Sequence, residues 1–446
     1  MNKNFVTIQT IASPLSASIR PPGSKSITNR AVLAAALAKG VSVLNGVLDS
    51  EDTNVMRDAL GKLGVAFDDS GTNVLTVRGR GNGNDSQTNS CDIYVANSGT
   101  TARFLTAALA FLDGDYYLYG KERMHERPIG DLLDALRKWD AAIDCKQRDG
   151  FPPLQIHGTS SNSRNNAATV DTTIAGTISS QFLSALLLAS PLATRETRRV
   201  ISVTSPLVSI PYVKMTLAVM EAFGVTALAT DAYDWFEIPR GSSYNSTNYT
   251  IEPDASAASY FLAAAAVAGG AMTVEGLSHG SLQGDVRFAD CLAAMGCDLH
   301  WHSNSITIVR PPECKLHGIT VNMNEISDTA QTLGVVALFA DTPTTITDIA
   351  HVRHKETDRI AALATELRKF GVRVDEHEDG LTITPSQSEN CEPIEVATYD
   401  DHRMAMSFAV AGLKRKGVTI QNPGCTDKTY PKFFEDFGRV TDRKYV

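Results

Sequence analysis

The sequence is poor in cysteine, in net positive charge and in long apolar runs. Seven cysteines are scattered among 446 residues with no Cys-x-x-Cys pair, which argues against a disulfide framework and for reduced thiols. A net charge of −9 argues against sequence-independent nucleic-acid binding, which needs a basic face. The longest apolar stretches, 181–193 and 260–274, are too short to span a bilayer, so we expect buried helices and no membrane partner.

Motifs for metals and nucleotides are also missing. The sequence has no HExxH, no EF-hand loop and no clustered Cys and His, so no metal site is expected. The letters GSKS at 23–26 resemble part of a Walker A loop, but Lys25 follows Ser24 instead of a glycine, and no GxGxxG links a strand to a helix. We therefore expect no cofactor. The N-terminus MNKNFVTIQT lacks a long apolar segment, so a cytoplasmic location is expected.

What the sequence does contain is a repeat. A helix rich in small residues, a short strand, a second helix and a strand pair recur six times, from Ser24, Ser98, Ser179, Ser256, Asp328 and Asp401. The spacing of roughly 70 to 80 residues is longer than a solenoid repeat, so each unit resembles a small α/β subdomain. Apolar residues recur at i, i+3 and i+4 in the helices and alternate in the strands.

The length of the chain favours two domains, each with three of these units. The sixth unit ends at Val446 without its strand pair, whereas the N-terminal segment alternates like a strand and has no helix of its own. We therefore expect one domain at 22–242 and a second one made of 1–21 together with 243–446.

Each first helix of a unit begins with polar residues: SKSITNR, NSGTTAR, TISSQ, DASAAS, SDTAQT and DDHR. Such residues are often only N-caps, and that interpretation is sufficient for DASAAS. It does not explain Lys25, Arg30, Arg103 and Arg403, because a cation at a helix N-terminus opposes the helix dipole. An anion lying between the cation and the helix end would remove this conflict, so these helix ends are candidate anion sites.

Basic segments between the elements support this interpretation. They lie at 121–130, 351–359, 400–404 and 425–428. Each alone could be a solvated run of charge, but their equivalent places in the repeat favour binding of phosphate or carboxylate groups. Among these cations lie Asp328 and Glu356, which are either structural ion-pair partners or a candidate acid and base.

Taken in order, several segments resemble the EPSP synthase family of enolpyruvyl transferases. They are PPGSKSITNRAVLAAALAKG, NSGTTAR, RMHERPIGDLLDALR, ISSQFLSALLL, QGDVRFAD, HKETDRIAALATELRK, YDDHRMAMSFA and CTDKTYPKFFE. The resemblance implies a two-domain inside-out barrel of six βαβαββ units, three per domain, that closes around its substrates. It also implies transfer of the enolpyruvyl group of phosphoenolpyruvate to the 5-hydroxyl of shikimate 3-phosphate, with release of phosphate.

The resemblance also assigns residues to the two substrates. For phosphoenolpyruvate it implies Lys25, Asn97, Gly99, Thr100, Arg127, Glu356, Arg359, Arg403 and Lys428. For shikimate 3-phosphate it implies Ser26, Arg30, Ser179, Ser180, Gln181, Ser209, Tyr212, Asp328, His351 and Lys355. Within these sets we expect Asp328 to accept the hydroxyl proton, and Glu356 and Lys25 to handle the proton on C3 of phosphoenolpyruvate.

Three positions depart from the pattern of the family. His351 lies where the family commonly has asparagine. In NSGTTARF, Ser98 replaces a small apolar residue and Phe104 replaces a proline. The last two lie near the expected phosphoenolpyruvate pocket, where the inhibitor glyphosate also binds in this family.

Two other functions stay open at this point. The related enolpyruvyl transferase acts on UDP-N-acetylglucosamine, but it typically has a cysteine in the loop before Arg-Pro, and KERMHERP has none. It also usually has asparagine where this chain has Ser26. The second alternative is a non-catalytic anion-binding protein of the same fold. No exposed apolar stripe stands out, so a monomer is expected.

Overall fold

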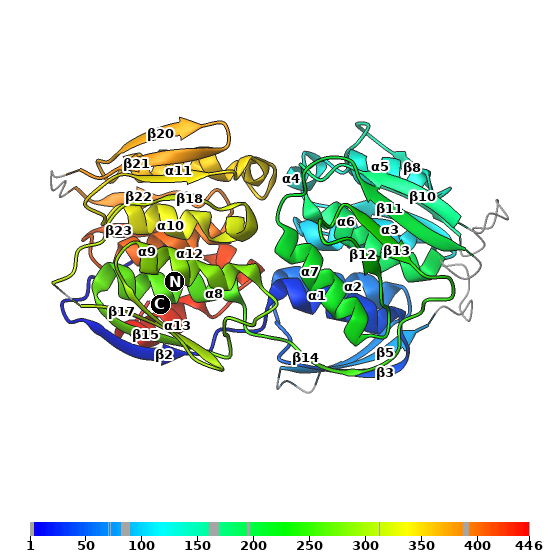
Figure 1. The fold of residues 1–446 in the computed structure, drawn as a ribbon, viewed down its shortest axis with the longest axis horizontal. Coiled ribbons are helices and arrows are strands. Elements are labelled where there is room, and N and C mark those ends of the chain that lie inside the picture. The colour runs from blue at the N-terminus through cyan, green and yellow to red at the C-terminus, as the bar shows by residue number, and fades with distance from the viewer. Residues whose placement is uncertain are drawn as a thin grey trace. The chain divides into compact units, whose positions relative to one another are not determined.

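The computed structural model describes residues 4–69, 71, 73–81, 90–159, 169–193, 197–311, 313–386 and 392–445. The chain forms two compact units, an N-terminal unit at Gly23–Ile251 and a C-terminal unit made of Met1–Pro22 with Glu252–Val446 (Figure 1).

The chain passes from the N-terminal unit back into the C-terminal unit after Ile251. This boundary lies nine residues later than the boundary 242/243 expected from the sequence, because a strand in this stretch belongs to the N-terminal unit. This strand, β14 (Asn248–Thr250), pairs in parallel with β3 (Lys39–Asn45). The polar composition of 241–250 is typical of a linker and hides this pairing.

The N-terminal unit begins at the first of the small-residue helices. Its elements are α1 (Lys25–Leu37), β3, α2 (Glu51–Lys62), β4 (Ala66–Asp69), β5 (Val74–Arg80), β6 (Cys91–Tyr94), α3 (Gly99–Leu109), β7 (Gly114–Tyr119), α4 (Glu122–His125), α5 (Gly130–Arg137), β8 (Ala142–Cys145), β9 (Leu154–Gly158), β10 (Thr169–Ile174), α6 (Ser180–Ala189), η1 (Ser190–Ala193), β11 (Arg198–Val203), α7 (Ile210–Ala222), β12 (Leu228–Ala229), β13 (Trp235–Ile238) and β14.

The C-terminal unit takes two strands from the start of the chain. Its elements are β1 (Phe5–Thr7), β2 (Leu15–Ile19), α8 (Ala255–Ala268), β15 (Gly270–Glu275), η2 (Gly284–Arg287), α9 (Phe288–Ala294), β16 (Asp298–Trp301), β17 (Ser305–Arg310), β18 (Thr320–Asn322), η3 (Asn324–Thr329), α10 (Ala330–Ala337), β19 (Thr344–Thr347), η4 (Ala350–His354), α11 (Arg359–Arg368), β20 (Arg373–His377), β21 (Gly380–Thr384), β22 (Ile394–Val396), α12 (His402–Ala411), β23 (Val418–Gln421), η5 (Pro423–Lys428) and α13 (Phe433–Thr441).

The described strands form six sheets, five with four strands and one with three, that are built in a common order. Their orders are β14-β3-β5-β4, β6-β7-β9-β8, β10-β11-β13-β12, β2-β15-β17-β16, β18-β19-β21-β20 and β22-β23-β1. In each sheet the first two strands are parallel and the others add antiparallel, which is the βαβαββ pattern. β2 opens the fourth sheet, and β1 completes the sixth by pairing with β23. The predicted α/β fold with six units is confirmed.

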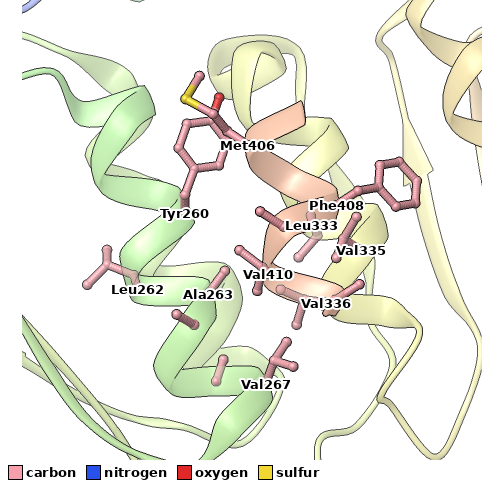
Figure 2. Packing of buried hydrophobic residues seen from close by; sticks show 14 of the residues in the cluster. Tyr260, Leu262, Ala263, Val267, Leu333, Val335, Val336, Met406, Phe408 and Val410 are labelled. Carbon is pink, nitrogen blue, oxygen red and sulfur yellow. The ribbon is translucent and has the colours of Figure 1, made fainter. Parts of the chain in front are cut away.

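One helix of each of the six repeats is buried, and these inner helices form the cores of the N-terminal and C-terminal units. They are α1, α3 and α6 in the N-terminal unit and α8, α10 and α12 in the C-terminal unit. Every residue of α8 is buried, as expected for a helix without a polar face. Figure 2 shows Tyr260 and Val267 of α8 beside Leu333 of α10 and Val410 of α12. Helices thus lie inside and sheets outside in each unit.

Candidate functional site

Many of the cations and carboxylates of the C-terminal unit gather near the N-termini of α10, α11 and α12. Asp328 precedes α10 in η3, and Lys355 and Glu356 follow η4 just before α11. Arg359 is the first residue of α11, and Arg403 lies in the first turn of α12. Lys428 ends η5. The repeat therefore delivers most of these groups to one cluster, because α10, α11 and α12 have them at or just before their N-termini.

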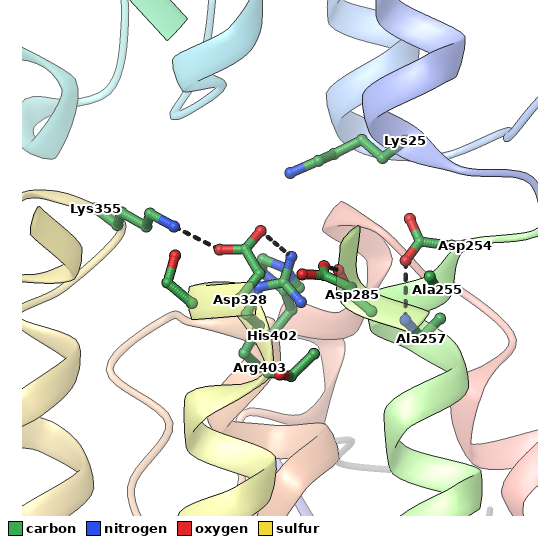
Figure 3. Close-up of polar contacts among 12 residues, drawn as sticks. Lys25, Asp254, Ala255, Ala257, Asp285, Asp328, Lys355, His402 and Arg403 are labelled. Carbon is green, nitrogen blue, oxygen red and sulfur yellow. Dashed lines mark hydrogen bonds and ion pairs between the residues drawn. The ribbon is translucent and has the colours of Figure 1, made fainter. Parts of the chain in front are cut away.

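Asp328 is the centre of this cluster. Its Oδ1 accepts hydrogen bonds from Lys355 Nζ at 2.5 Å and from Arg359 at 3.1 Å. Its Oδ2 accepts one from Arg403 at 2.6 Å. Figure 3 shows Lys355 and Arg403 reaching the carboxylate from different sides. Three cations therefore hold a carboxylate in a fixed orientation, which suits either an ion-pair centre or a positioned base.

Arg359 joins Asp328 to the other carboxylates of the cluster. It is 2% exposed and donates to Glu356 at 2.9 Å and to Asp401 at 2.7 Å. Burial alone would lower the pKa of Arg359, but the carboxylates of Asp401, Glu356 and Asp328 together raise it. Lys428 Nζ lies 3.6 Å from Glu356 Oε1. Cations and carboxylates thus alternate through a buried network.

His351 is neutral in this environment. Burial and, next, the charge of Lys355 lower its pKa to about 3. Its Nε2 lies 2.8 Å from Oγ of Ser327, the residue that precedes Asp328 in the sequence, so the ring is held close to this carboxylate. Burial also lowers the pKa of Lys355, although Asp328 opposes the shift. A neutral imidazole offers one donor and one acceptor, so it can take part in hydrogen bonds in both directions.

The N-terminus of α8 is occupied by side chains of the protein itself. Asp254 accepts from Ala257 N at 2.9 Å, and Gln283 Oε1 accepts from Ala255 N at 3.0 Å. The buried Asp285 accepts a hydrogen bond from Ser256 Oγ. Burial, reinforced by the charge of Asp328, raises the pKa of Asp285 to about 6. The N-cap interpretation of DASAAS is therefore confirmed.

In the N-terminal unit, Lys25 begins α1 and forms an ion pair with Asp52. The two charged atoms lie 3.5 Å apart, and both side chains are largely buried. Asp52 lies in the first turn of α2, where a carboxylate also favours the helix dipole. The cation at the start of α1 thus has a carboxylate beside it that the spacing of the sequence did not indicate.

Arg30 is buried one turn further along α1. Its guanidinium donates to Thr216 Oγ1 at 2.7 Å, to the carbonyl of Ser26 at 2.9 Å and to the carbonyl of Tyr212 at 3.2 Å. A fourth bond reaches Ser184 Oγ at 3.3 Å. Burial lowers the pKa of Arg30 to about 10, so it stays charged at neutral pH.

Arg127 and the start of α3 form a second basic site in this unit. Arg127 donates to Asn97 through its carbonyl at 3.0 Å and its Oδ1 at 3.2 Å. Gly99 packs so closely that a Cβ there would lie 2.3 Å from Arg127 NH2. Thr100 follows in the first turn of α3. Ser98, which departs from the family pattern, caps α3 by accepting from Thr101 N at 3.3 Å.

The remaining predicted residues of this unit lie at the starts of α6 and α7. Ser179 caps α6 by accepting from Gln181 N at 3.2 Å, and Ser180 is the first residue of the helix. Ser209 precedes α7 with φ at 55°, a left-handed conformation that is costly for a residue other than glycine. Tyr212 follows in the first turn of α7. All of these residues therefore lie at the N-terminus of a helix, either α6 or α7.

Hydrogen bonds and ion pairs therefore link most of the predicted residues within their own unit. Sequence reasoning missed three acidic partners, Asp52, Asp285 and Asp401. Asp401 belongs to the segment DDHR and Asp285 to QGDVRFAD, but only the fold shows that Asp401 pairs with Arg359 and that Asp285 accepts from Ser256.

Across the described part of the chain, no group of three or more His, Cys, Asp and Glu residues is arranged to hold a metal ion. In the same residues, no helix has both the length and the apolar composition needed to cross a membrane.

Known proteins match this chain over nearly its whole length. A family model described as EPSP synthase (3-phosphoshikimate 1-carboxyvinyltransferase) matches residues 9–437. The 3-phosphoshikimate 1-carboxyvinyltransferase of Ralstonia pickettii is 47% identical over 428 residues, covering 95% of this chain and 96% of its own. The chloroplastic enzyme of Arabidopsis thaliana is 44% identical over 440 residues, 96% of this chain and 83% of its own.

A solved structure agrees with these sequence matches. The EPSP synthase from Acinetobacter baumannii has a TM-score of 0.78 against this chain, at 25% identity, and the match covers 98% of both chains. The resemblance inferred from the motifs is confirmed. The chain belongs to the EPSP synthase family and catalyses the 3-phosphoshikimate 1-carboxyvinyltransferase step of the shikimate pathway.

Proposed function

We propose that the two groups of side chains divide the work of this transfer between them. The N-terminal group, with Ser26, Arg30 and the starts of α6 and α7, holds shikimate 3-phosphate. The C-terminal group, with Glu356, Arg359, Arg403 and Lys428, holds phosphoenolpyruvate. Lys25, Asn97, Gly99, Thr100 and Arg127 add contacts to phosphoenolpyruvate from the N-terminal unit.

The reaction needs positioned proton transfer because neither the hydroxyl group of one substrate nor the enol carbon of the other reacts readily without it. An alcohol is a poor nucleophile at neutral pH, and C3 of an enol phosphate is a poor base. We assign Asp328 as the base that takes the proton of the 5-hydroxyl. His351 and Lys355 hold the ring and hydroxyls of shikimate 3-phosphate beside it. Glu356 and Lys25 deliver a proton to C3 and remove it when phosphate leaves.

The cations stabilise the charges that the reaction carries. Phosphoenolpyruvate brings a carboxylate and a phosphate, and Arg127, Arg359, Arg403 and Lys428 offer donors that fit both. The observation that carries this proposal is the contact of three cations with the two oxygens of Asp328. Anionic substrates compete for those cations and leave the carboxylate free to accept a proton.

Phosphate release tests the acceptor and the base together. The protein is incubated with phosphoenolpyruvate and either shikimate 3-phosphate or UDP-N-acetylglucosamine, and we expect phosphate only with the first. Asp328→Asn keeps the shape of the side chain but cannot take the proton, so we expect kcat to fall by about 10²- to 10⁴-fold. Asp341→Asn, which alters a carboxylate paired with His317, is the matched control. A normal kcat for Asp328→Asn would refute its role as the base.

We further propose that the protein acts as a monomer in the cytoplasm, without a nucleic-acid or membrane partner. The net charge of −9 supports the absence of nucleic-acid binding. Light scattering coupled to gel filtration would give about 48 kDa for the monomer, the mass of one chain. A mass near twice that value would overturn this part of the proposal.

A further inference from the structure

Arg30 carries a buried positive charge that no carboxylate of the described residues neutralises. The acceptors of its hydrogen bonds are two hydroxyls and two main-chain carbonyls, contributed by Thr216, Ser184, Ser26 and Tyr212. The side chain is only 2% exposed. This differs from Arg359, which contacts three carboxylates. The charge of Arg30 is therefore oriented by neutral groups and stays available for an anion.

An aromatic ring completes the surroundings of this guanidinium. The guanidinium carbon of Arg30 lies 5.2 Å from the ring centroid of Phe104, within the range of a cation–π contact. Phe104 is 0% exposed and lies on α3, whereas Arg30 lies on α1. The contact is desolvated, and desolvation strengthens the attraction between a cation and the negative face of a ring.

We propose that Phe104 is a positioning residue that orients Arg30 for shikimate 3-phosphate. The proposal rests on the proposed role of Arg30 in binding that substrate. A ring can fix the guanidinium without cancelling its charge, whereas a carboxylate at the same place would compete with an anionic substrate.

Fluorinated phenylalanines at position 104 test the electrostatic part of this contact. Fluorine weakens the negative face of the ring while nearly preserving its size, whereas Phe104→Leu would also change core packing. We expect the KM for shikimate 3-phosphate to rise with each added fluorine, by about two- to thirty-fold across the series. The KM for phosphoenolpyruvate and the melting temperature should change little.

The same analogues at Phe111 form the matched control. Phe111 is also buried in this unit, and it packs against the ring of Trp139 at 6.1 Å instead of against a cation. We expect no change in either KM from fluorination there. Equal changes at both positions would show a packing effect and would overturn the proposal.

Arg30→Lys separates the two proposals. If this variant leaves the KM for shikimate 3-phosphate unchanged, the proposed role of Arg30 is wrong, and the role of Phe104 falls with it. If Arg30→Lys raises that KM but fluorination at Phe104 does not, only the role of Phe104 is overturned. A double-mutant cycle with 3,4,5-trifluorophenylalanine at position 104 should show the two changes to be non-additive.

Discussion

At the scale of single residues, Gly99 shows how closely the site is packed. A Cβ there would lie 2.3 Å from Arg127 NH2, which is the flexible end of a side chain, so the guanidinium can shift without unfolding α3. For Gly99→Ala we expect the KM for phosphoenolpyruvate to rise about tenfold or more, which corresponds to about 1.4 kcal/mol. The melting temperature should stay within a few degrees. Steady-state kinetics and thermal unfolding measure both.

Gly61→Ala is the control for this glycine substitution. A Cβ at Gly61, in α2, meets no atom within 4 Å. Alanine there should leave both KM values unchanged and slightly stabilise the helix. A normal KM for phosphoenolpyruvate in Gly99→Ala would show that Arg127 does not need its present position.

The buried carboxylate of Asp285 should make the free energy of unfolding depend on pH. Its pKa is raised to about 6, above the usual value near 3.9, because burial disfavours the ionised form. The folded protein therefore binds this proton more tightly than the unfolded chain, and the cost of ionisation grows as the pH rises toward 6 and is fully present above it. Asp285→Asn removes this cost and still accepts from Ser256. We expect the variant to be more stable than the parent at pH 8, by up to about 3 kcal/mol, and to show a smaller gain at pH 5.

Urea unfolding at the two pH values measures this gain. Asp290→Asn, which alters a half-exposed carboxylate on α9 that pairs with Arg287, provides the comparison, and its gain at pH 8 should be smaller than that of Asp285→Asn. If the gain in stability of Asp285→Asn were equal at pH 5 and pH 8, the ionisation of a buried carboxylate could not be its cause.

The individual residues also show where sequence reasoning reaches its limit. The cations at helix starts were interpreted as needing an anion nearby. Part of that anion charge is supplied by the protein itself, as in the pair of Arg359 with Asp401 and that of Lys25 with Asp52. Members of such pairs lie far apart along the chain and follow no fixed spacing. Only the fold brings them together, so the sequence could locate the cations but not their partners.

At the scale of elements, a chain of hydroxyl groups ties the three inner helices of the C-terminal unit together. Thr332 of α10 lies 3.1 Å from Ser259 of α8 and 3.2 Å from Ser407 of α12, oxygen to oxygen. All three side chains are buried. Because these helices begin at the cluster around Asp328, their mutual packing fixes where Asp328 and Arg403 lie.

Thr332→Val removes the central hydroxyl and keeps the volume of the side chain. Two serine hydroxyls then lose a partner inside the core, so we expect a loss of about 1–3 kcal/mol in the free energy of unfolding. Thr365→Val, on the exposed face of α11, removes a hydroxyl that bonds only to the helix backbone and should cost less. Urea unfolding of the two variants measures the difference. Equal losses would mean that the buried hydroxyl chain adds nothing to stability.

Elements differ in how well their sequences predict them. The inner helices were predictable because their sequences rich in small residues repeat, and because a capping residue such as Ser24, Ser98 or Asp401 precedes every one of them except α10. β14 was not predictable, because its three residues are polar and its partner β3 lies about 200 residues earlier in the chain. A short strand gains its stability from that pairing and not from its own composition.

At the scale of the whole molecule, the two units differ in how the chain builds them. The N-terminal unit is one continuous segment, Gly23–Ile251, which contains every described strand of its three sheets. The C-terminal unit depends on the distant start of the chain, because β2 forms an edge of one sheet and β1 an edge of another. Ile8, Ile11, Leu15 and Ile19 from this segment are also part of its hydrophobic core.

Dividing the chain at the two crossings should therefore give unequal fragments. Residues 23–251 carry a complete core, and we expect this fragment to unfold cooperatively in urea. Residues 252–446 lack two strands and four buried aliphatic side chains, each worth about 1.5–3 kcal/mol when buried, so we expect this fragment to be unfolded or only loosely packed. Fusing residues 4–22 to its C-terminus through a flexible linker should restore cooperative unfolding, since those residues can then pair with β15 and β23. Cooperative unfolding of 252–446 alone would show that the C-terminal unit does not need β1 and β2 in order to fold.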